Sequence, residues 1–88
     1  MVMMVEAVLE YYGLISDRCR RERETVCVSA EQGRAEGQIR SFIREHYPAL
    51  PPYSLLLDGY VLPDSAVARL SNGSRIKVLP WTGGEQAV

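Results

Sequence analysis

The residues with the clearest chemical meaning in this chain are two adjacent glycines near its end, Gly83 and Gly84. They follow a strand-like run that stops at Pro80 and a short stretch that contains Trp81. Glycine has no Cβ and adopts backbone conformations closed to other residues, so such a tail can thread into the narrow active site of another protein. Glu85–Val88 come after Gly84 and block the carboxylate that the tail would present. Whether Gly84 becomes a free C-terminus therefore decides what the chain can do.

The other side chains that could do chemistry do not form a recognisable set. His46 has no second histidine and no suitably spaced cysteine, which argues against a metal site. It is expected in the last turn of a helix, where a protonated imidazole interacts favourably with the helix dipole. Cys27 is expected to be a small residue in mid-strand, and Cys19 to be exposed in a loop without a partner thiol. We therefore expect a protein that is not an enzyme and that binds no metal or cofactor.

Length, composition and charge favour a small carrier, adaptor or binding module. At 88 residues the chain forms one small domain, and 47% hydrophobic with 24% charged residues is an ordinary globular composition. A net charge of −1 provides no field that would attract nucleic acid or a membrane. The apolar start lacks a basic region and is interrupted at Glu6, so we expect it to be neither a signal peptide nor a membrane span. We expect a cytoplasmic protein.

Two strands are predicted in the first third of the chain. Residues 2–12 alternate in polarity up to Gly13, and residues 25–30 alternate again. The side chains expected to face the core are Met3, Val5, Ala7, Leu9 and Tyr11 in the first strand and Val26, Val28 and Ala30 in the second. Arginines and acidic residues are interleaved from Asp17 to Glu24, which predicts a solvated hairpin loop rather than a surface that binds phosphate or an acidic partner.

The period then changes to that of a helix, which is predicted to begin at about Ala35 and to end before Pro48. Its apolar side carries Ile39, Phe42, Ile43, His46 and Tyr47. Short strands are predicted over residues 54–57, 60–62 and 75–79, with turns at Asp58-Gly59 and Asn72-Gly73; Ile76 and Val78 face inward and Leu79 outward. One sheet of four to five strands packed on one main helix, an α+β fold, is the economical way to bury one apolar sheet face.

This order of elements, with an Asn72-Gly73 turn, a last strand, Pro80 and then Gly83-Gly84, resembles the MoaD/ThiS sulfur-carrier proteins. These are small ubiquitin-like β-grasp domains with a mixed sheet. The resemblance extends from Val2 to Gly84 and implies a β-grasp domain over residues 1–82 with a flexible tail over residues 83–88. It also implies that the first and last strands are parallel neighbours at the sheet centre, which suits Met3–Leu9 and Ile76–Leu79.

The resemblance implies a chemistry that belongs to partners. An ATP-dependent activating enzyme of the MoeB/ThiF type would adenylate Gly84, and a sulfur donor would displace AMP to leave a thiocarboxylate. An acceptor synthase would then receive the sulfur. Gly84 would carry the acyl group, and Gly83, which has no side chain, would lead up to it in the partner's narrow channel. The sequence leaves open whether the acceptor is molybdopterin or tungstopterin, the thiazole of thiamine, cysteine, another natural product or transfer RNA.

The chain departs from the simplest pattern of that family, in which the second glycine is the last residue. Glu85–Val88 would have to be removed first, as a metalloprotease does for some relatives, so the chain is interpreted as a proform. Trp81 has two interpretations: an anchor that docks the tail on the activating enzyme, or a ring folded back over Val8 or Cys27. Trp81, Leu79 and Val8 are the candidate docking residues.

Two further functions remain open. The chain could be a protein modifier that joins Gly84 to a lysine of a target protein. It could also be a binding domain in which Gly83-Gly84 is only a flexible end. The interface of such a domain would be the half-apolar outer face, with Val8, Cys27, Leu79 and Trp81.

Overall fold

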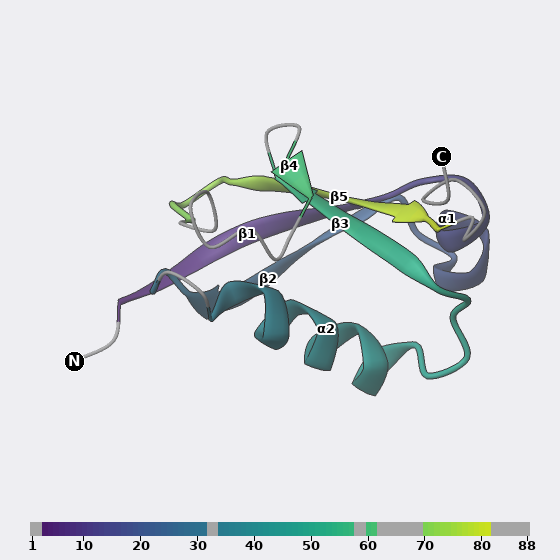
Figure 1. Ribbon diagram of the computed structural model, residues 1–88, viewed down its shortest axis with the longest axis horizontal. Helices are drawn as coiled ribbons and strands as arrows, with labels where there is room; N and C mark the ends of the chain where they lie inside the picture. Colours follow the sequence, from purple (N-terminus) through teal and green to yellow (C-terminus); the bar gives the residue numbers. More distant parts are fainter. Residues whose placement is uncertain (1–2, 32–33, 58–59, 62–69, 82–88) are drawn as a thin grey trace.

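The computed structural model describes residues 3–31, 34–57, 60–61 and 70–81. The elements are, in chain order, β1 (Met4–Tyr11), α1 (Gly13–Cys19), β2 (Arg23–Ser29), α2 (Ala35–His46), β3 (Tyr53–Leu57), β4 (Tyr60–Val61) and β5 (Arg75–Pro80) (Figure 1). The predicted turn at Asp58-Gly59 and the tail beyond Trp81 lie outside the described residues. No helix in the described ranges is long and apolar enough to cross a membrane.

The strands form one mixed sheet in the order β2-β1-β5-β3-β4. β1 and β5 are parallel neighbours at its centre, as the resemblance implied, while β2 pairs with β1 and β3 pairs with β5 in the antiparallel sense. The parallel pairing uses the second half of β1, with Val8 opposite Arg75 and Tyr11 opposite Val78. Figure 1 shows α2 running along the sheet beside β2.

The core lies between α2 and one face of the sheet. The helix contributes Ala35, Ile39 and Ile43, all fully buried. The buried strand residues are Val5, Ala7, Leu9 and Tyr11 in β1, Val26 and Val28 in β2, Leu55 and Leu57 in β3, and Ile76 and Val78 in β5. The alternation of polarity in the sequence therefore predicted the inward-facing strand residues correctly, apart from Met3. Met3 is 71% exposed and precedes β1, which begins at Met4.

The charged stretch after β1 is not the predicted hairpin loop. β1 ends at Tyr11, and Gly13 begins the short helix α1 instead of only ending a strand. Ile15 and Cys19, one helical turn apart, are 0% and 6% exposed, so the prediction that Cys19 is exposed was wrong. This apolar pair belongs to the hydrophobic core and packs α1 against it. α1 ends at Cys19 and is capped by Arg20, which has φ 61° and donates its N–H to the Ser16 carbonyl.

A largely buried carboxylate, that of Glu24, joins β1, β2 and the end of α2. The hydroxyls of Tyr11 and Tyr47 both donate to Oε2 of Glu24, at 2.5 and 2.7 Å. Arg21 lies 3.1 Å from the other oxygen, and the Glu24 side chain is only 13% exposed. Burial, with the hydrogen bond to Glu24, raises the pKa of Tyr47 to about 12 and raises the pKa of Tyr11 still further.

The Glu24 cluster predicts a loss of stability in alkaline solution. Unfolded tyrosines lose their protons near pH ~10, whereas the folded hydroxyls keep theirs. The contribution of Tyr47 to stability is therefore complete below pH ~10 and is lost as the pH rises through the folded value of about 12. Tyr47→Phe should cost about 1–2 kcal/mol at pH 7, and this deficit should shrink above pH ~10.

Urea denaturation from neutral to alkaline pH measures the effect. Tyr12→Phe is the matched control, because Tyr12 is 40% exposed and its hydroxyl makes only a 3.4 Å contact with Glu10. A deficit for Tyr47→Phe that stays constant across this pH range would contradict the assignment.

Candidate functional site

The point at which the tail leaves the sheet is held on both sides. β5 lies between β1 and β3 and ends at Pro80, opposite Tyr53. The Val78 carbonyl accepts the N–H of Tyr12 at 3.1 Å, and Trp81 donates its N–H to the Pro52 carbonyl at 3.1 Å. The chain is therefore positioned as far as Trp81. The predicted sulfur-bearing residues Gly83 and Gly84 lie outside the described residues.

α1 packs against the end of β5 through a glycine. Gly13 has φ +56°, in the left-handed region, and a Cβ there would lie 3.4 Å from Cγ of Pro80. A side chain at this position would strain the backbone, and its Cβ would lie in van der Waals contact with the last residue of β5. Gly13 thus supplies the left-handed conformation that starts α1 beside the root of the tail, which we define as Pro80 and Trp81. In Figure 1, α1 and the end of β5 lie at the same end of the molecule.

The structure does not bring the three predicted docking residues into one patch. Val8 and Leu79 lie on the sheet face opposite α2, and both are partly buried. Val8 sits opposite Thr25 of β2 and Arg75 of β5. Leu79 is four positions beyond Arg75 along the same strand, which separates it from the level of Val8 by roughly 13 Å. Of the three, Trp81 belongs to the root of the tail and Leu79 directly precedes it, whereas Val8 lies elsewhere on the sheet.

A row of side chains with alternating charge crosses the strands between Val8 and Leu79. It consists of the successive cross-strand partners Arg23, Glu10 and Lys77 on β2, β1 and β5. Beyond Lys77, the next partners across the sheet are the apolar Leu56 and Val61. Opposite charges that face one another across strands stabilise the sheet modestly. This outer face is therefore charged in its middle, not continuously apolar. The sequence did not reveal the row because it depends on the register of strands far apart in the chain.

Exposed apolar side chains gather instead at the root of the tail. Tyr12, Leu14 and Trp81 are 40%, 46% and 45% exposed. Tyr12 and Leu14 flank Gly13, the residue that contacts Pro80, and Trp81 follows Pro80. Tyr12 and Leu14 were missed because the segment was assigned to a strand end and a loop. Cys27, by contrast, is exposed on β2.

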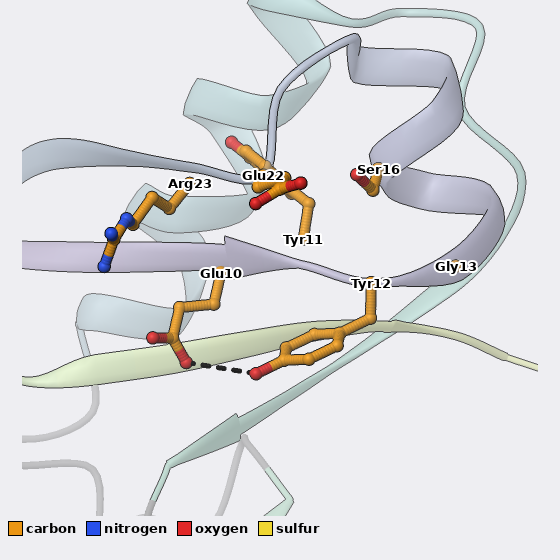
Figure 2. Close-up of a pocket in the computed structure, with 7 residues that line it drawn as sticks. All are labelled: Glu10, Tyr11, Tyr12, Gly13, Ser16, Glu22 and Arg23. Atoms are coloured by element: carbon orange, nitrogen blue, oxygen red, sulfur yellow. Dashed lines mark hydrogen bonds between the residues drawn. The ribbon is translucent and has the colours of Figure 1, made fainter.

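A shallow pocket of about 360 Å³ lies between the end of β1, α1 and the start of β2. Figure 2 shows the residues that line it: Glu10, Tyr11, Tyr12, Gly13, Ser16, Glu22 and Arg23. The Tyr12 hydroxyl donates to Glu10 at 3.4 Å, and the Ser16 hydroxyl donates to the Arg21 carbonyl at 3.2 Å. Ser16 has no histidine beside it here, so the lining offers polar contacts and no activated nucleophile.

His46 has a local structural role. Its ring stacks on Phe42 with centroids 4.1 Å apart, and Nδ1 lies 2.9 Å from the Phe42 carbonyl oxygen. His46 is exposed, so it does not extend the buried side of α2 as the spacing predicted. Among the described residues, no three His, Cys, Asp or Glu side chains are grouped so that they could hold a metal ion.

A mixed sheet with parallel first and last strands at its centre and one long helix on one face defines the ubiquitin-like β-grasp fold. The predicted α+β class is therefore confirmed. The small archaeal modifier protein 1 from Methanosarcina acetivorans has this fold with a TM-score of 0.64 and 12% identity, covering 93% of this chain and 98% of its own. The Haloferax volcanii HVO 2177 protein matches with a TM-score of 0.61 and 18% identity, covering 92% of this chain and 88% of its own.

Sequence comparison adds no closer relative. No family model matches the chain, and no curated protein matches it. Likeness at 12% and 18% identity shows the fold alone. Membership of the MoaD/ThiS family within this fold therefore stays a prediction.

Substitution of two glycines by alanine is expected to change the stability of the domain in opposite directions. Gly13→Ala forces a side chain into the left-handed region beside Pro80 and should destabilise the domain by about 1–2 kcal/mol. Gly37→Ala is the control, because Gly37 lies within α2 and an added Cβ meets no atom within 4 Å. It should stabilise the domain by about 0.5–1 kcal/mol. Urea denaturation of both variants is the measurement, and equal effects of the same sign would refute this description of Gly13.

Proposed function

We propose that this chain is a sulfur carrier that becomes active when Glu85–Val88 are removed and Gly84 is the C-terminus. The observation that carries the proposal is the anchoring of β5. This central strand is bonded on both sides, and the hydrogen bonds of Val78 and Trp81 hold its end. A tail that must enter a partner's active site benefits from a fixed starting point, because the binding energy of the domain is then transmitted to the reacting end.

The proposed reaction takes place on a partner that activates the carboxylate. An oxygen of the Gly84 carboxylate attacks the α-phosphorus of ATP and pyrophosphate leaves. Hydrosulfide, as the sulfur donor, then attacks the acyl carbon; it loses its proton, and AMP leaves with the electron pair of the broken C–O bond, so that Gly84 ends in a thiocarboxylate. The thiocarboxylate passes its sulfur to an acceptor synthase. ATP is therefore a substrate of the activating enzyme, of the MoeB/ThiF type, and not a cofactor of this chain.

The described side chains are assigned to docking. The apolar group at the root of the tail, made of Tyr12, Leu14 and Trp81, would seat the domain beside the partner's channel. The neighbouring Glu10 and Lys77 would set its orientation, since charged groups at an interface contribute mainly to specificity and association rate. We place the protein in the cytoplasm, where ATP and reducing conditions support this chemistry.

A modifier function is the second candidate. It is favoured by the fold shared with a protein whose name is small archaeal modifier protein 1. In that case the same adenylate would be attacked by a lysine amine of a target protein, with loss of AMP and formation of an amide. A binding domain with an inert tail is the third possibility. It would use the outer face around Val8, Cys27 and Leu79.

The sulfur-carrier proposal predicts processing followed by thiocarboxylate formation. Intact-mass spectrometry after incubation in extract of the native cells should show a species that ends at Gly84. A chain made to end at Gly84 should be adenylated in the presence of ATP, activating enzyme and sulfur donor, and should gain the mass difference between sulfur and oxygen. The full 88-residue chain is the control and should not react in the absence of the protease.

The same experiment separates the alternatives. Amide-linked adducts of high mass in place of a thiocarboxylate would show the modifier function. Persistence of the full-length mass, with no adenylation of the truncated chain, would leave the binding domain as the explanation.

Docking through Trp81 predicts a loss of binding that exceeds the loss of stability. Trp81→Ala should weaken binding to the activating enzyme by about tenfold or more, as expected for an aromatic anchor, while the melting temperature falls by only a few degrees. Met4→Ala is the control, because Met4 is 51% exposed at the start of β1, at the other end of the sheet. Calorimetric titration and thermal denaturation are the measurements; equal binding by both variants would exclude Trp81 as the anchor.

A further inference from the structure

The two edges of the sheet differ in how much backbone they expose. β4 forms one edge and has only 2 residues, whereas β2 forms the other edge and has 7. A long edge strand is a template for pairing with another strand unless Pro, charged side chains or a covering segment protect it. β2 contains neither Pro nor Lys, and its charged residues, Arg23 and Glu24, occupy only its first two positions.

The hydrogen bonds to β1 determine which groups of β2 point outward. Just beyond the strand ends, Tyr11 donates to the Glu22 carbonyl at 2.8 Å and Ala30 donates to the Met3 carbonyl at 2.9 Å. In the same register the bonded pairs alternate, so residues 24, 26 and 28 bond to β1. The N–H and C=O groups of Thr25 and Cys27 therefore point away from the sheet.

The contacts of Ser29 agree with this pattern. Its N–H, also on the outer edge, donates to Oε1 of Gln38 at 2.6 Å. Within the described ranges, the outward groups of Thr25 and Cys27 have no such partner, and both residues are exposed. Gln38 of α2 thus binds the outward backbone N–H at the Ser29 end of the β2 edge. The outward backbone groups in the middle of that edge remain available for hydrogen bonds.

An open hollow of about 370 Å³ adjoins this edge, between β2 and α2. Val26, Val28 and Phe42 line it, together with Gly37, where an added Cβ would meet no atom within 4 Å. Side chains of an added strand would therefore have space beside α2.

We propose that β2 pairs with β2 of a second copy of this chain, in the antiparallel sense, about a two-fold axis at Val26. Val26 is the middle residue of Arg23–Ser29, so this register centres the pairing on the open middle of the edge, and the N–H of Ser29 at the closed end takes no part in it. It places Thr25 of each copy opposite Cys27 of the other. The free N–H and C=O groups of one copy then bond those of the other, and the bond between Ser29 and Gln38 is kept.

The side chains in this register are self-complementary. Val26 meets Val26 of the second copy beside the hollow. Arg23 lies opposite Ser29 and Glu24 opposite Val28, so no like charges face one another along the strand. An unrelated peptide could use the same backbone groups, but a second β2 supplies both the valine beside the hollow and a strand whose charges do not oppose those of the first. The dimer goes beyond the proposed function and leaves the root of the tail accessible, because β1 separates β2 from β5.

Sedimentation analysis tests the dimer. The mass should rise from 9.9 kDa to twice that value as the protein concentration is raised. Thr25→Pro removes an outward N–H that no bond to β1 needs, so the variant should fold and remain monomeric. Thr25→Val is the matched control, which keeps the N–H and a branched side chain and should dimerise as the unmodified chain does. A single 9.9 kDa species at every concentration, or dimerisation of the proline variant, would overturn the proposal.

Thiol cross-linking tests the register, including the case in which the proline variant fails to fold. The exposed Cys27 is the reactive thiol of the unmodified chain, since Cys19 is 6% exposed. A chain with Thr25→Cys and Cys27→Ser is mixed with the unmodified chain and oxidised with diamide, which takes up the two electrons and two protons of the thiols. Directly opposite residues, about 5.5 Å apart between Cα atoms, lie within disulfide range.

The control carries Arg23→Cys and Cys27→Ser, which places the new thiol opposite Ser29 of the second copy, one diagonal step from Cys27. The variant at position 25 should form the mixed disulfide at least several-fold faster than the variant at position 23. Equal rates, or faster reaction at position 23, would overturn the register.

Discussion

The parallel pairing of β1 with β5 is the constraint on which the rest of the structure depends. Parallel neighbours cannot be joined by a tight turn, so the chain must cross over between them, and α2 lies within that connection. The same helix covers the face on which Leu9 and Ile76 are fully buried. Because β5 is bonded to β1 on one side and to β3 on the other, a shift in its register would break two ladders and expose its apolar residues. The place where the chain leaves the sheet is fixed by these pairings.

Contacts near the end of β5 also fix the position at which the chain leaves the sheet. Gly13 starts α1 beside Pro80, and Trp81 is bonded to the segment that precedes β3. Glu24 accepts hydrogen bonds from Tyr11 and Tyr47, so the end of α2 is tied to β1 and β2 at a buried polar centre. These contacts stabilise one end of the domain without providing a catalytic group among the described residues. In the proposed role, the domain presents a tail to other enzymes. This role requires a rigid domain and no catalytic activity of the domain itself.

The parts of the fold that the sequence predicted are those with several repeats of a period. The alternation in β1 and the spacing of Ile39 and Ile43 in α2 each gave the buried side chains correctly. α1 was missed because its apolar face is a single pair, Ile15 and Cys19, surrounded by charges that are equally typical of a loop. Met3 was misplaced because alternation continues past the start of β1, and periodicity does not show where a strand begins.

The amino-acid sequence alone was enough to predict the order of the strands and of the main helix α2, the inward faces of the long strands and the position of the double glycine after the last strand. These follow from the chemistry of neighbours along the chain, which sets periodicity and turns. Only the tertiary structure decided that Arg23, Glu10 and Lys77 form a row, that Val8 is separated from Leu79, and that the backbone of Thr25 and Cys27 faces outward. The reason is physical: a hydrogen-bond register is a relation between strands distant in the chain, and local periodicity carries no information about which residues will be opposite one another.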